Sequence, residues 1–528
     1  LGDSRALDGL VDVATMAEFQ TYASLRSQSV SLLKGAAFRT EAMGKLGAII
    51  LADDKPTLWV QAAITLGEFG ADGVSALLAA ADTPVPEGKP VDHYSSRVEK
   101  QFTSLTSDAA LAAFVSAYDR IPAGQKDRRA KVLDQLLRYR NNLKDDGIEL
   151  LGRAADDATL EAPKRAEAIN ACAEARGKEA LAKLTAWAKA EDAVLRAQAV
   201  QCLGRSYIPI KSSQPLLVDA LKSAGDDYAK VRQNALEGLM RSDDKTLLPM
   251  FLDSLDPAKE TSADVRNRAL TALDSFRRPA KLKEEDLIGP VSLRMADSDG
   301  NVRATALRVG CGMALRLNQK DKAVELVEKG LQDNDDRVRE QAYGQVAGLG
   351  DSLKPDKVVD AALKEEKLNL KSEAVRALSM RTSFGENPRT EQLVALAGAV
   401  LSGLPGHQAH AVDLLAALTD KAGAFTQASK VLRDLIAAKS EGPGKDYSQL
   451  APLVRALVRI KDDGMFSTLE KLAQEESLDL RRACVDAYAE MGSKADVAFL
   501  RALRDRTDAP SVHVRGQIDS AIRKLEEK

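Results

Sequence analysis

SADVRNRALTAL (Ser262–Leu273) and DGNVRATALRVG (Asp299–Gly310) follow one pattern, and this pattern decides the fold. In both stretches a turn is followed by an apolar residue, an arginine, a small residue and then further apolar residues. Apolar residues at i, i+3, i+4 and i+7 are typical of a helix with one buried face. The same pattern recurs at residues 192–204, 227–239, 335–350, 479–492 and 511–522.

The arginine of each stretch sets the period of a repeat. Arg196, Arg232, Arg266, Arg303 and Arg339 are separated by 36, 34, 37 and 36 residues. Weaker copies extend the series in both directions. The step from Gln408 to Arg481 is 73 residues, about two periods, which indicates a degenerate copy near residue 445. The weaker anchors are Arg26, Gln61, Arg97, Arg129 and Arg165 upstream, and Lys371, Gln408, Arg481 and Arg515 downstream. About 15 copies fit the chain, which leaves no room for another globular domain.

Each copy is predicted to form two helices, such as those that begin near Ala180 and Leu195. Asp, Ser or Pro stands before the second helix, where a helix N-terminus prefers these residues. Glycine often follows its last Leu or Met, as at Gly204, Gly350 and Gly492, which is typical of a helix C-terminus. A single pair cannot bury its apolar face, whereas stacked pairs can. We therefore expect an all-α fold: one right-handed α-α superhelix of about 15 hairpins over residues 1–528.

Composition agrees with this fold class and excludes others. The chain is 45% hydrophobic, 29% charged and 4% aromatic, which favours helices with small core residues over β-structure. Lys and Arg number 75 and Asp and Glu 78, so the net charge is −3 and the chain as a whole lacks the basic footprint of a nucleic-acid binder. No apolar run is long enough for a membrane helix. Cys172, Cys202, Cys311 and Cys484 form no CxxC pair and are expected to be buried thiols.

An acidic residue often stands six positions before the anchor arginine. One acid at the turn and one base on the second helix, repeated at each step, predict a ladder of ion pairs and backbone hydrogen bonds between adjacent repeats. Such pairs would fix the stacking geometry more than they would add stability, since an exposed pair contributes only about 0–1 kcal/mol. The predicted structural ladder consists of Asp226, Arg232, Glu260, Arg266, Asp297, Arg303, Asp333, Arg339, Glu475 and Arg481.

The "VR" anchors, the acid six positions earlier and the "LG" helix ends resemble those of HEAT-repeat proteins, in particular the short bacterial HEAT-like repeats also called phycobilisome-lyase repeats. The resemblance covers nearly the whole chain. It implies a solenoid whose second helices line a concave surface that binds a protein partner, in the bacterial cytoplasm. It implies no cofactor. Some relatives are bilin lyases, but no set of residues in this sequence matches a lyase site, so this activity is not transferred to the chain.

Two features concern domain organisation. LGDSRALDGL at the start is similar to MGSKADVAFL (Met491–Leu500), where glycine ends one helix pair, so we expect the chain to be the C-terminal part of a longer protein with any catalytic domain upstream. Residues 439–447 predict a bend or a degenerate repeat. Prolines and glycines also predict interruptions at 82–92, 206–215, 276–290 and 384–389.

Signals of catalysis or metal binding are weak. The residues that follow His93, His407, His410 and His513 are not glutamates, which excludes the His-Glu pairs of the di-iron hydroxylases in the HEAT class. No GxxxxGK[ST] or GxSxG motif is present. We therefore predict no catalytic, cofactor or metal residues and a non-catalytic scaffold for a protein partner. Binding of a nucleic-acid backbone by basic stretches such as 126–131 and 277–283 is the alternative, and a lyase or glycosylase activity is less favoured.

Overall fold

The computed structural model describes residues 5–15, 23–35, 39–52, 56–85, 87–89, 94, 98, 108–122, 124–381, 389–404, 408–418, 424–440, 447–506 and 508–528. Every regular element in these ranges is a helix, and no strand occurs in them. The predicted all-α class is therefore confirmed. No helix in the described part of the chain is long and apolar enough to span a membrane.

Contacts divide the chain into two compact units, and we describe each by itself. Unit 1 comprises Leu1–Leu247 with Arg278–Ala280, and unit 2 comprises Leu248–Arg277 with Lys281–Lys528. Whether the two units continue one solenoid through residues 1–528 stays a prediction. In both units a first helix (A) is followed by a second helix (B), as the sequence predicts.

The helices of unit 1 form successive A–B pairs along the chain. They are α1 (Arg5–Thr15) with α2 (Ala23–Leu32), α3 (Arg39–Leu51) with α4 (Pro56–Gly67), α7 (Asp108–Arg120) with α8 (Lys126–Arg138), α9 (Asp145–Asp156) with α10 (Ala162–Arg176), α11 (Leu181–Trp187) with α12 (Ala193–Leu203), and α13 (Ile210–Leu221) with α14 (Ala229–Leu239). The A helix α5 (Ala71–Ala81) also belongs to this unit; the anchor Arg97 that follows it lies outside the described residues.

Unit 2 has the same alternation. Its pairs are α15 (Leu248–Asp253) with α16 (Ala263–Phe276), α17 (Glu284–Leu293) with α18 (Gly300–Arg316), α19 (Lys320–Leu331) with α20 (Asp336–Leu349), α21 (Pro355–Lys364) with α22 (Leu368–Ser379), α23 (Thr390–Gly403) with α24 (Gln408–Leu418), α25 (Ala424–Ser440) with α26 (Tyr447–Arg459), α27 (Phe466–Leu472) with α28 (Leu478–Met491), and α29 (Val497–Arg504) with α30 (Ala509–Glu527).

The pair α25–α26 stands where the sequence predicts a degenerate copy, so the repeat continues through this region. Residues 441–446, the centre of the stretch 439–447, lie outside the described residues, and a bend there stays a prediction.

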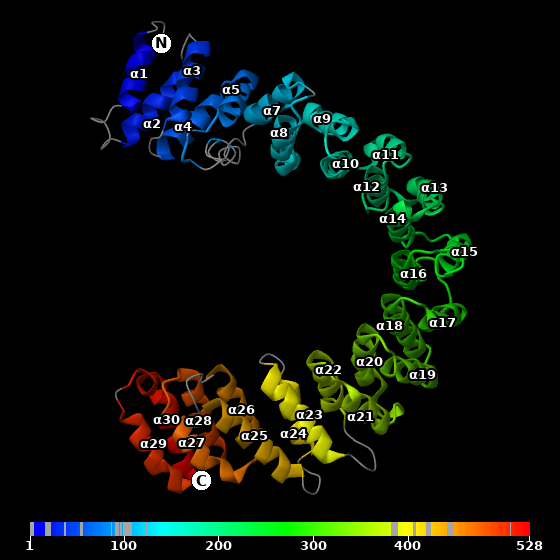
Figure 1. Cartoon of the computed structure of the whole chain (residues 1–528), viewed down its shortest axis with the longest axis vertical. Coiled ribbons are helices and arrows are strands. Elements are labelled where there is room, and N and C mark those ends of the chain that lie inside the picture. The colour runs from blue at the N-terminus through cyan, green and yellow to red at the C-terminus, as the bar shows by residue number, and fades with distance from the viewer. Residues whose placement is uncertain are drawn as a thin grey trace. The chain divides into compact units, whose positions relative to one another are not determined.

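Successive B helices lie side by side within each unit (Figure 1). In unit 2 each B helix from α16 to α28 packs against the next B helix of the series that ends at α30, and in unit 1 α12 packs against both α10 and α14. Their contact faces are rich in alanine and leucine, for example Ala306 and Leu307 of α18 and Ala374 and Leu378 of α22, all fully or almost fully buried. Small side chains let helix axes approach to roughly 8–10 Å, which explains the low aromatic content.

Several B helices begin with the predicted capping residues, whereas Ser262 makes no side-chain cap bond at the start of α16. The side chain of Asp192 accepts hydrogen bonds from the backbone of Val194 and Leu195 at the start of α12, and Asp299 does the same for α18. Asp335, Ser477 and Asp508 cap α20, α28 and α30. Such caps satisfy backbone donors that would otherwise be unpaired at a helix N-terminus.

Two predicted interruptions are partly wrong. The stretch 206–215 already contains the first turns of α13, and 276–290 contains most of α17, so Pro215 and Pro290 lie inside helices. Each proline removes the hydrogen bond to the carbonyl four residues earlier, at Lys211 or Asp286. Both of these residues are exposed, so water can bond their carbonyls and the helix continues. Residues 384–388 of another predicted interruption lie outside the described residues.

Glycine allows one close approach between B helices of unit 1. Gly204 follows α12 with a right-handed backbone (φ −79°), so its role is not a left-handed C-cap as the sequence suggests. A Cβ on Gly204 would lie 2.8 Å from Cα of Gly238 in α14, and a Cβ on Gly238 would lie 2.8 Å from Cδ1 of Leu217. The two glycines therefore let α12 and α14 touch through their backbones.

We predict that Gly238→Ala destabilises the protein by about 1–3 kcal/mol, because the added methyl group overpacks this contact. Gly47→Ala in α3 is the matched control, since its Cβ would meet nothing within 4 Å. The control should be neutral or stabilising by about 0.5–1 kcal/mol, since alanine favours a helix more than glycine does. Urea unfolding followed by circular dichroism measures both changes, and equal shifts for the two variants would contradict the packing account.

Candidate functional site

Unit 2 carries a row of arginine–carboxylate pairs at the turns between A and B helices. Arg266 of α16 binds Asp297 through two hydrogen bonds of 2.8 Å. Arg303 of α18 binds Asp333 at 2.8 and 2.7 Å. In each case the arginine belongs to one repeat and the carboxylate to the next, so each pair joins adjacent repeats.

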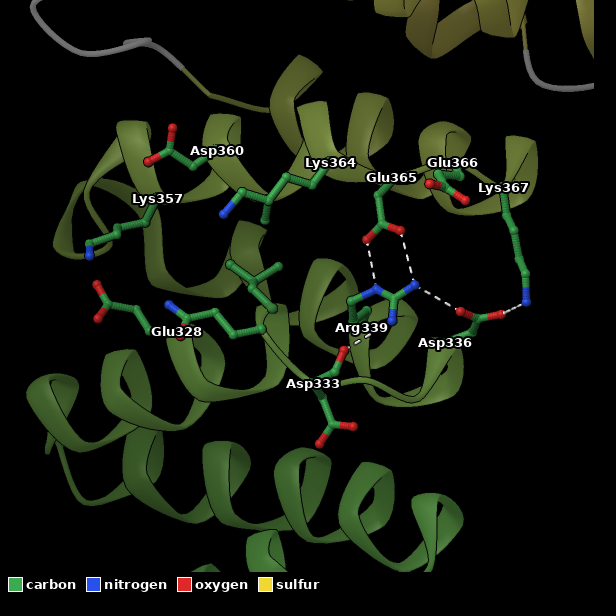
Figure 2. Close-up of a pocket in the computed structure, with 13 residues that line it drawn as sticks. Glu328, Asp333, Asp336, Arg339, Lys357, Asp360, Lys364, Glu365, Glu366 and Lys367 are labelled. Carbon is green, nitrogen blue, oxygen red and sulfur yellow. Dashed lines mark hydrogen bonds and ion pairs between the residues drawn. The ribbon is translucent and has the colours of Figure 1, made fainter.

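The next repeat continues this row. Arg339 of α20 binds both carboxylate oxygens of Glu365, with distances of 2.9 and 3.1 Å from Nε and Nη2 (Figure 2). The hydroxyl of Tyr343 donates to the same carboxylate at 3.0 Å. Two parallel bonds from one guanidinium fix both distance and orientation, which a lysine could not do.

The same arginines also bind their own repeat. Nη1 of Arg303 donates to the carbonyl of Asp297 at 2.9 Å, and Nη1 of Arg339 donates to that of Asp333 at 2.9 Å. Arg266 and Arg481 bind the carbonyls of Glu260 and Glu475 at 3.0 and 2.7 Å. The acid six positions before the arginine therefore offers its carbonyl to its own repeat and, at Asp297 and Asp333, its carboxylate to the preceding one.

These acids also shape the turn in which they lie. Oδ1 of Asp297 accepts from the backbone N–H of Asp299 at 3.0 Å, and Oδ1 of Asp333 accepts from that of Asp335 at 2.8 Å. Oε1 of Glu260 accepts from the N–H of Ser262 at 2.9 Å. One side chain thus orders its own turn while it binds the neighbouring repeat.

Burial makes the Arg266–Asp297 pair different from a surface ion pair. The side chains of Arg266 and Asp297 are 4% and 0% exposed. Burial alone would raise the pKa of Asp297, but the hydrogen bonds from Arg266 and from the N–H of Asp299 outweigh it, and the pKa is lowered. The pKa of Asp333 is lowered by the same balance, with Arg303 as the donor. Both carboxylates therefore remain charged in the folded protein.

The predicted residues at the two ends of the series make different contacts. Arg232 is buried and donates to the carbonyls of Ser223 and Gly225 at 2.9 and 2.8 Å, whereas Asp226 is exposed in a short 3-10 turn. Arg481 is buried and binds Asp508 and the hydroxyl of Ser511, which lies at 2.7 Å. Asp508 does not follow the predicted spacing, because this acid lies seven residues before the weak anchor Arg515 and not six.

A cleft of about 660 Å³ opens above the Arg339–Glu365 pair, between α19 and α21 (Figure 2). Lys357, Asp360 and Lys364 of α21 and Glu328 of α19 line it. Positive and negative side chains alternate around the cleft, so it offers no single-sign surface to a charged ligand.

Two further grooves lie on the exposed surface of the B helices. In unit 1 a groove of about 550 Å³ crosses α10 and α12 and is lined by Asn170, Gln198, Gln201 and Arg205, among others. In unit 2 a groove of about 640 Å³ has Arg455 and Arg459 of α26, alanines of α24 and α28 (Ala416, Ala483 and Ala487), and Asp486 and Glu490 of α28 in its lining. The sequence analysis identified neither groove, because their polar residues do not recur from repeat to repeat.

The four cysteines lie in surroundings that make a thiol unreactive. The four cysteine thiols are buried and unpaired, as the sequence predicts, and burial raises the pKa of Cys311 to about 11 and that of Cys484 to about 12. Among the described residues no group of three or more His, Cys, Asp or Glu side chains could hold a metal ion. His93 and His407 lie outside the described residues, and His410 and His513 lie in α24 and α30.

No protein-family model matches the chain, and no curated protein sequence is similar to it. Solved structures match its fold. A structure of Kap95p, reported with RanGDP, is 14% identical, with a TM-score of 0.54 and coverage of 99% of this chain and 78% of the other. Importin beta is 12% identical, with a TM-score of 0.51 and coverage of 98% and 82%. Both are HEAT-repeat α-solenoids, so the predicted HEAT-repeat fold is confirmed.

We predict that Asp297→Ala destabilises unit 2 by about 3–5 kcal/mol, because it leaves the buried Arg266 without its carboxylate. Glu325→Ala removes an exposed carboxylate that binds Lys322 at 3.0 Å within α19 and serves as the control. The control should cost less than about 0.5 kcal/mol. Urea unfolding measures both, and a similar small loss for the two variants would show that the buried pair does not hold the repeats.

We also predict a specific response to acid. Hydrogen bonding from Arg337 lowers the pKa of Asp335 to about 2. A carboxylate whose pKa is lowered by folding stabilises the protein above its unfolded pKa of about 3.9, and this contribution disappears as the pH falls toward 2. Asparagine in Asp335→Asn remains a good N-cap but cannot titrate. Between pH 4 and pH 2 the wild type should therefore lose up to about 2 kcal/mol more of its free energy of unfolding than the variant does. Thermal unfolding across this range checks the prediction, and identical slopes would refute it.

Proposed function

We propose that the chain is a non-catalytic scaffold that binds a protein partner along the exposed surface of its B helices, in the bacterial cytoplasm. The observation that carries this proposal is the row of B helices in each unit, which presents grooves lined by polar and charged side chains of both signs. A stack of this kind offers a long surface on which a partner can make many separate contacts. The assignment to a bacterial cytoplasm rests on the resemblance of the repeats.

The packing of the repeats from α16 to α22 supports a concave B-helix surface. Neighbouring B helices such as α18 and α20 contact one another extensively there, whereas the A helices α19 and α21 of successive repeats contact one another little. The repeats from α23 to α26 differ, because the A helices α23 and α25 contact one another more than the B helices α24 and α26 do. A stack whose B layer is closer than its A layer curves toward the B layer. A concave surface favours a partner that is elongated or helical, because such a partner can touch several repeats at once.

The charges of the grooves favour protein over nucleic acid. In the groove of unit 2, Arg455 and Arg459 face the same opening as Asp486 and Glu490, and Arg459 already binds Asp413 at 2.9 Å. Phosphate groups bind to surfaces of one positive sign, and nearby carboxylates repel them. A protein segment can match both signs, because it carries acidic and basic side chains of its own.

Site-specific photo-crosslinking of the full chain in cells tests this proposal. We expect a photoreactive amino acid at the B-helix positions Arg308 or Asp486 to capture a defined protein. The exposed A-helix positions Asp219 and Glu325 are the controls and should capture it at least about tenfold less, since they lie on the opposite layer. Capture from the A-helix positions alone, or capture of nucleic acid in place of protein, would contradict the proposal.

A further inference from the structure

The groove of unit 1 has an unusual centre. Three carboxamides from consecutive B helices, Asn170 of α10 and Gln198 and Gln201 of α12, line it together, and each is half-buried. Charged side chains also line it, with Arg140 and Arg205 on its rim and Glu167 on α10 between them. Neutral carboxamides beside side chains of both signs suit a ligand that offers hydrogen-bonding groups rather than a concentrated charge.

The hydrogen bonds of these carboxamides leave part of their capacity unused. Nε2 of Gln198 donates to Oε1 of Gln201 at 3.1 Å and to Oδ1 of Asn170 at 3.5 Å. Nδ2 of Asn170 donates to Glu174 at 3.1 Å. Oε1 of Gln198 and Nε2 of Gln201 bond to no other described residue. One acceptor and one donor of this hydrogen-bonded pair of side chains therefore remain available, and a peptide group offers the complementary N–H and C=O.

The size and floor of the groove fit an extended chain. Its lining runs from Leu137 at the end of α8 across α10 to α12, which is two steps between neighbouring B helices. At roughly 8–10 Å for each step and about 3.3 Å for each extended residue, the groove spans about five or six residues. Pro163, Ala166 and Ala171 form apolar parts of the lining, which leaves room for small apolar side chains.

The rim adds a preference for charge. Arg205 is exposed and its guanidinium binds no other described residue, so it is available to an acidic side chain. Arg140, by contrast, binds Glu174 at 3.0 Å. Lys164, beside the groove, binds Asp134 at 2.6 Å and Glu167 at 3.1 Å. A nucleic-acid backbone would meet these carboxylates together with a single available cation, which disfavours it.

We propose that this groove binds an extended peptide segment of the partner, with one peptide group paired to Gln198 and Gln201 and an acidic side chain on Arg205. The inference rests on the proposed function and deepens it, because it names the class of segment and the repeats that hold it. Recognition of the backbone would make the groove tolerant of sequence, and Arg205 would set the position of the acid.

An array of synthetic eight-residue peptides tests this inference on the full chain. Each peptide carries one aspartate or, in a matched set, one lysine, with the other positions varied. We expect the aspartate peptides to bind and the lysine peptides to bind at least about tenfold more weakly, and Arg205→Glu should reverse this preference. For the best peptide, N-methylation of one central amide should lower affinity about tenfold, which corresponds to the loss of roughly one hydrogen bond.

Variants of the carboxamide residues distinguish hydrogen bonding to the peptide backbone from non-specific peptide binding. Gln201→Glu keeps the shape but loses the donor, and Gln198→Ala loses the acceptor, so each should weaken peptide binding about tenfold. Gln345→Glu and Gln341→Ala on α20 of unit 2 are matched controls and should change nothing. Unchanged helicity and melting of all four variants exclude a folding defect.

The outcomes distinguish the two proposals. A partner captured at the B helices that still binds the Gln198 and Gln201 variants at full strength overturns this inference and leaves the proposed function standing. Absence of peptide binding, insensitivity to N-methylation, or displacement of the peptides by a single-stranded oligonucleotide also overturns it. Failure to capture any protein at the B helices overturns the proposed function itself.

Discussion

A hairpin of two helices has apolar surface on both flanks and can bury neither of them alone. In this chain the constraint is met by stacking, so that Ala306 and Leu307 of α18 are buried between neighbouring repeats and not within one. Most of the other features serve this arrangement. Alanine and paired glycines such as Gly204 and Gly238 allow close approach, and aspartate N-caps fix where α12, α18, α20 and α30 begin.

Hydrophobic burial brings repeats together but does not choose their rotation, because it has no direction. The arginine–carboxylate pairs of unit 2 supply direction. Arg303 holds the carbonyl of Asp297 in its own turn and the carboxylate of Asp333 in the next one. Because each such arginine bonds to two successive turns, it fixes the position of one turn relative to the next. Its desolvation is costly, so the pair contributes to geometry more than to net stability, and only the loss of one partner is expected to be severe.

The period of the arginines was enough to predict the helix pairs and the all-α class, because each repeat must solve the same packing problem at the same chain length. The HEAT-repeat fold was predicted from the resemblance of the "VR" anchors, the acids and the "LG" helix ends to that family. The spacing of six between acid and arginine was also visible in the sequence. The spacing could not reveal which repeat each group of Asp333 binds, because a spacing in sequence gives no direction. Its carbonyl accepts from Arg339 of the same repeat, and its carboxylate accepts from Arg303 of the preceding repeat. The repeat pattern could not predict the groove of Asn170, Gln198 and Gln201. These residues occur in one groove only, so they give no periodic signal in the sequence. Pro215 and Pro290 were misjudged because the exposure of Lys211 and Asp286, whose carbonyls lose a hydrogen bond, depends on tertiary packing.

The central claim is that neighbouring hairpins share one interior and cannot open separately. Native-state hydrogen exchange of the full chain in increasing urea tests it most directly. The account predicts that amides of α16, α18, α20 and α22 converge on one common free energy of opening, because the loss of one hairpin exposes the apolar flanks of its neighbours. A distinct opening free energy for each hairpin, with adjacent repeats still protected, would contradict it.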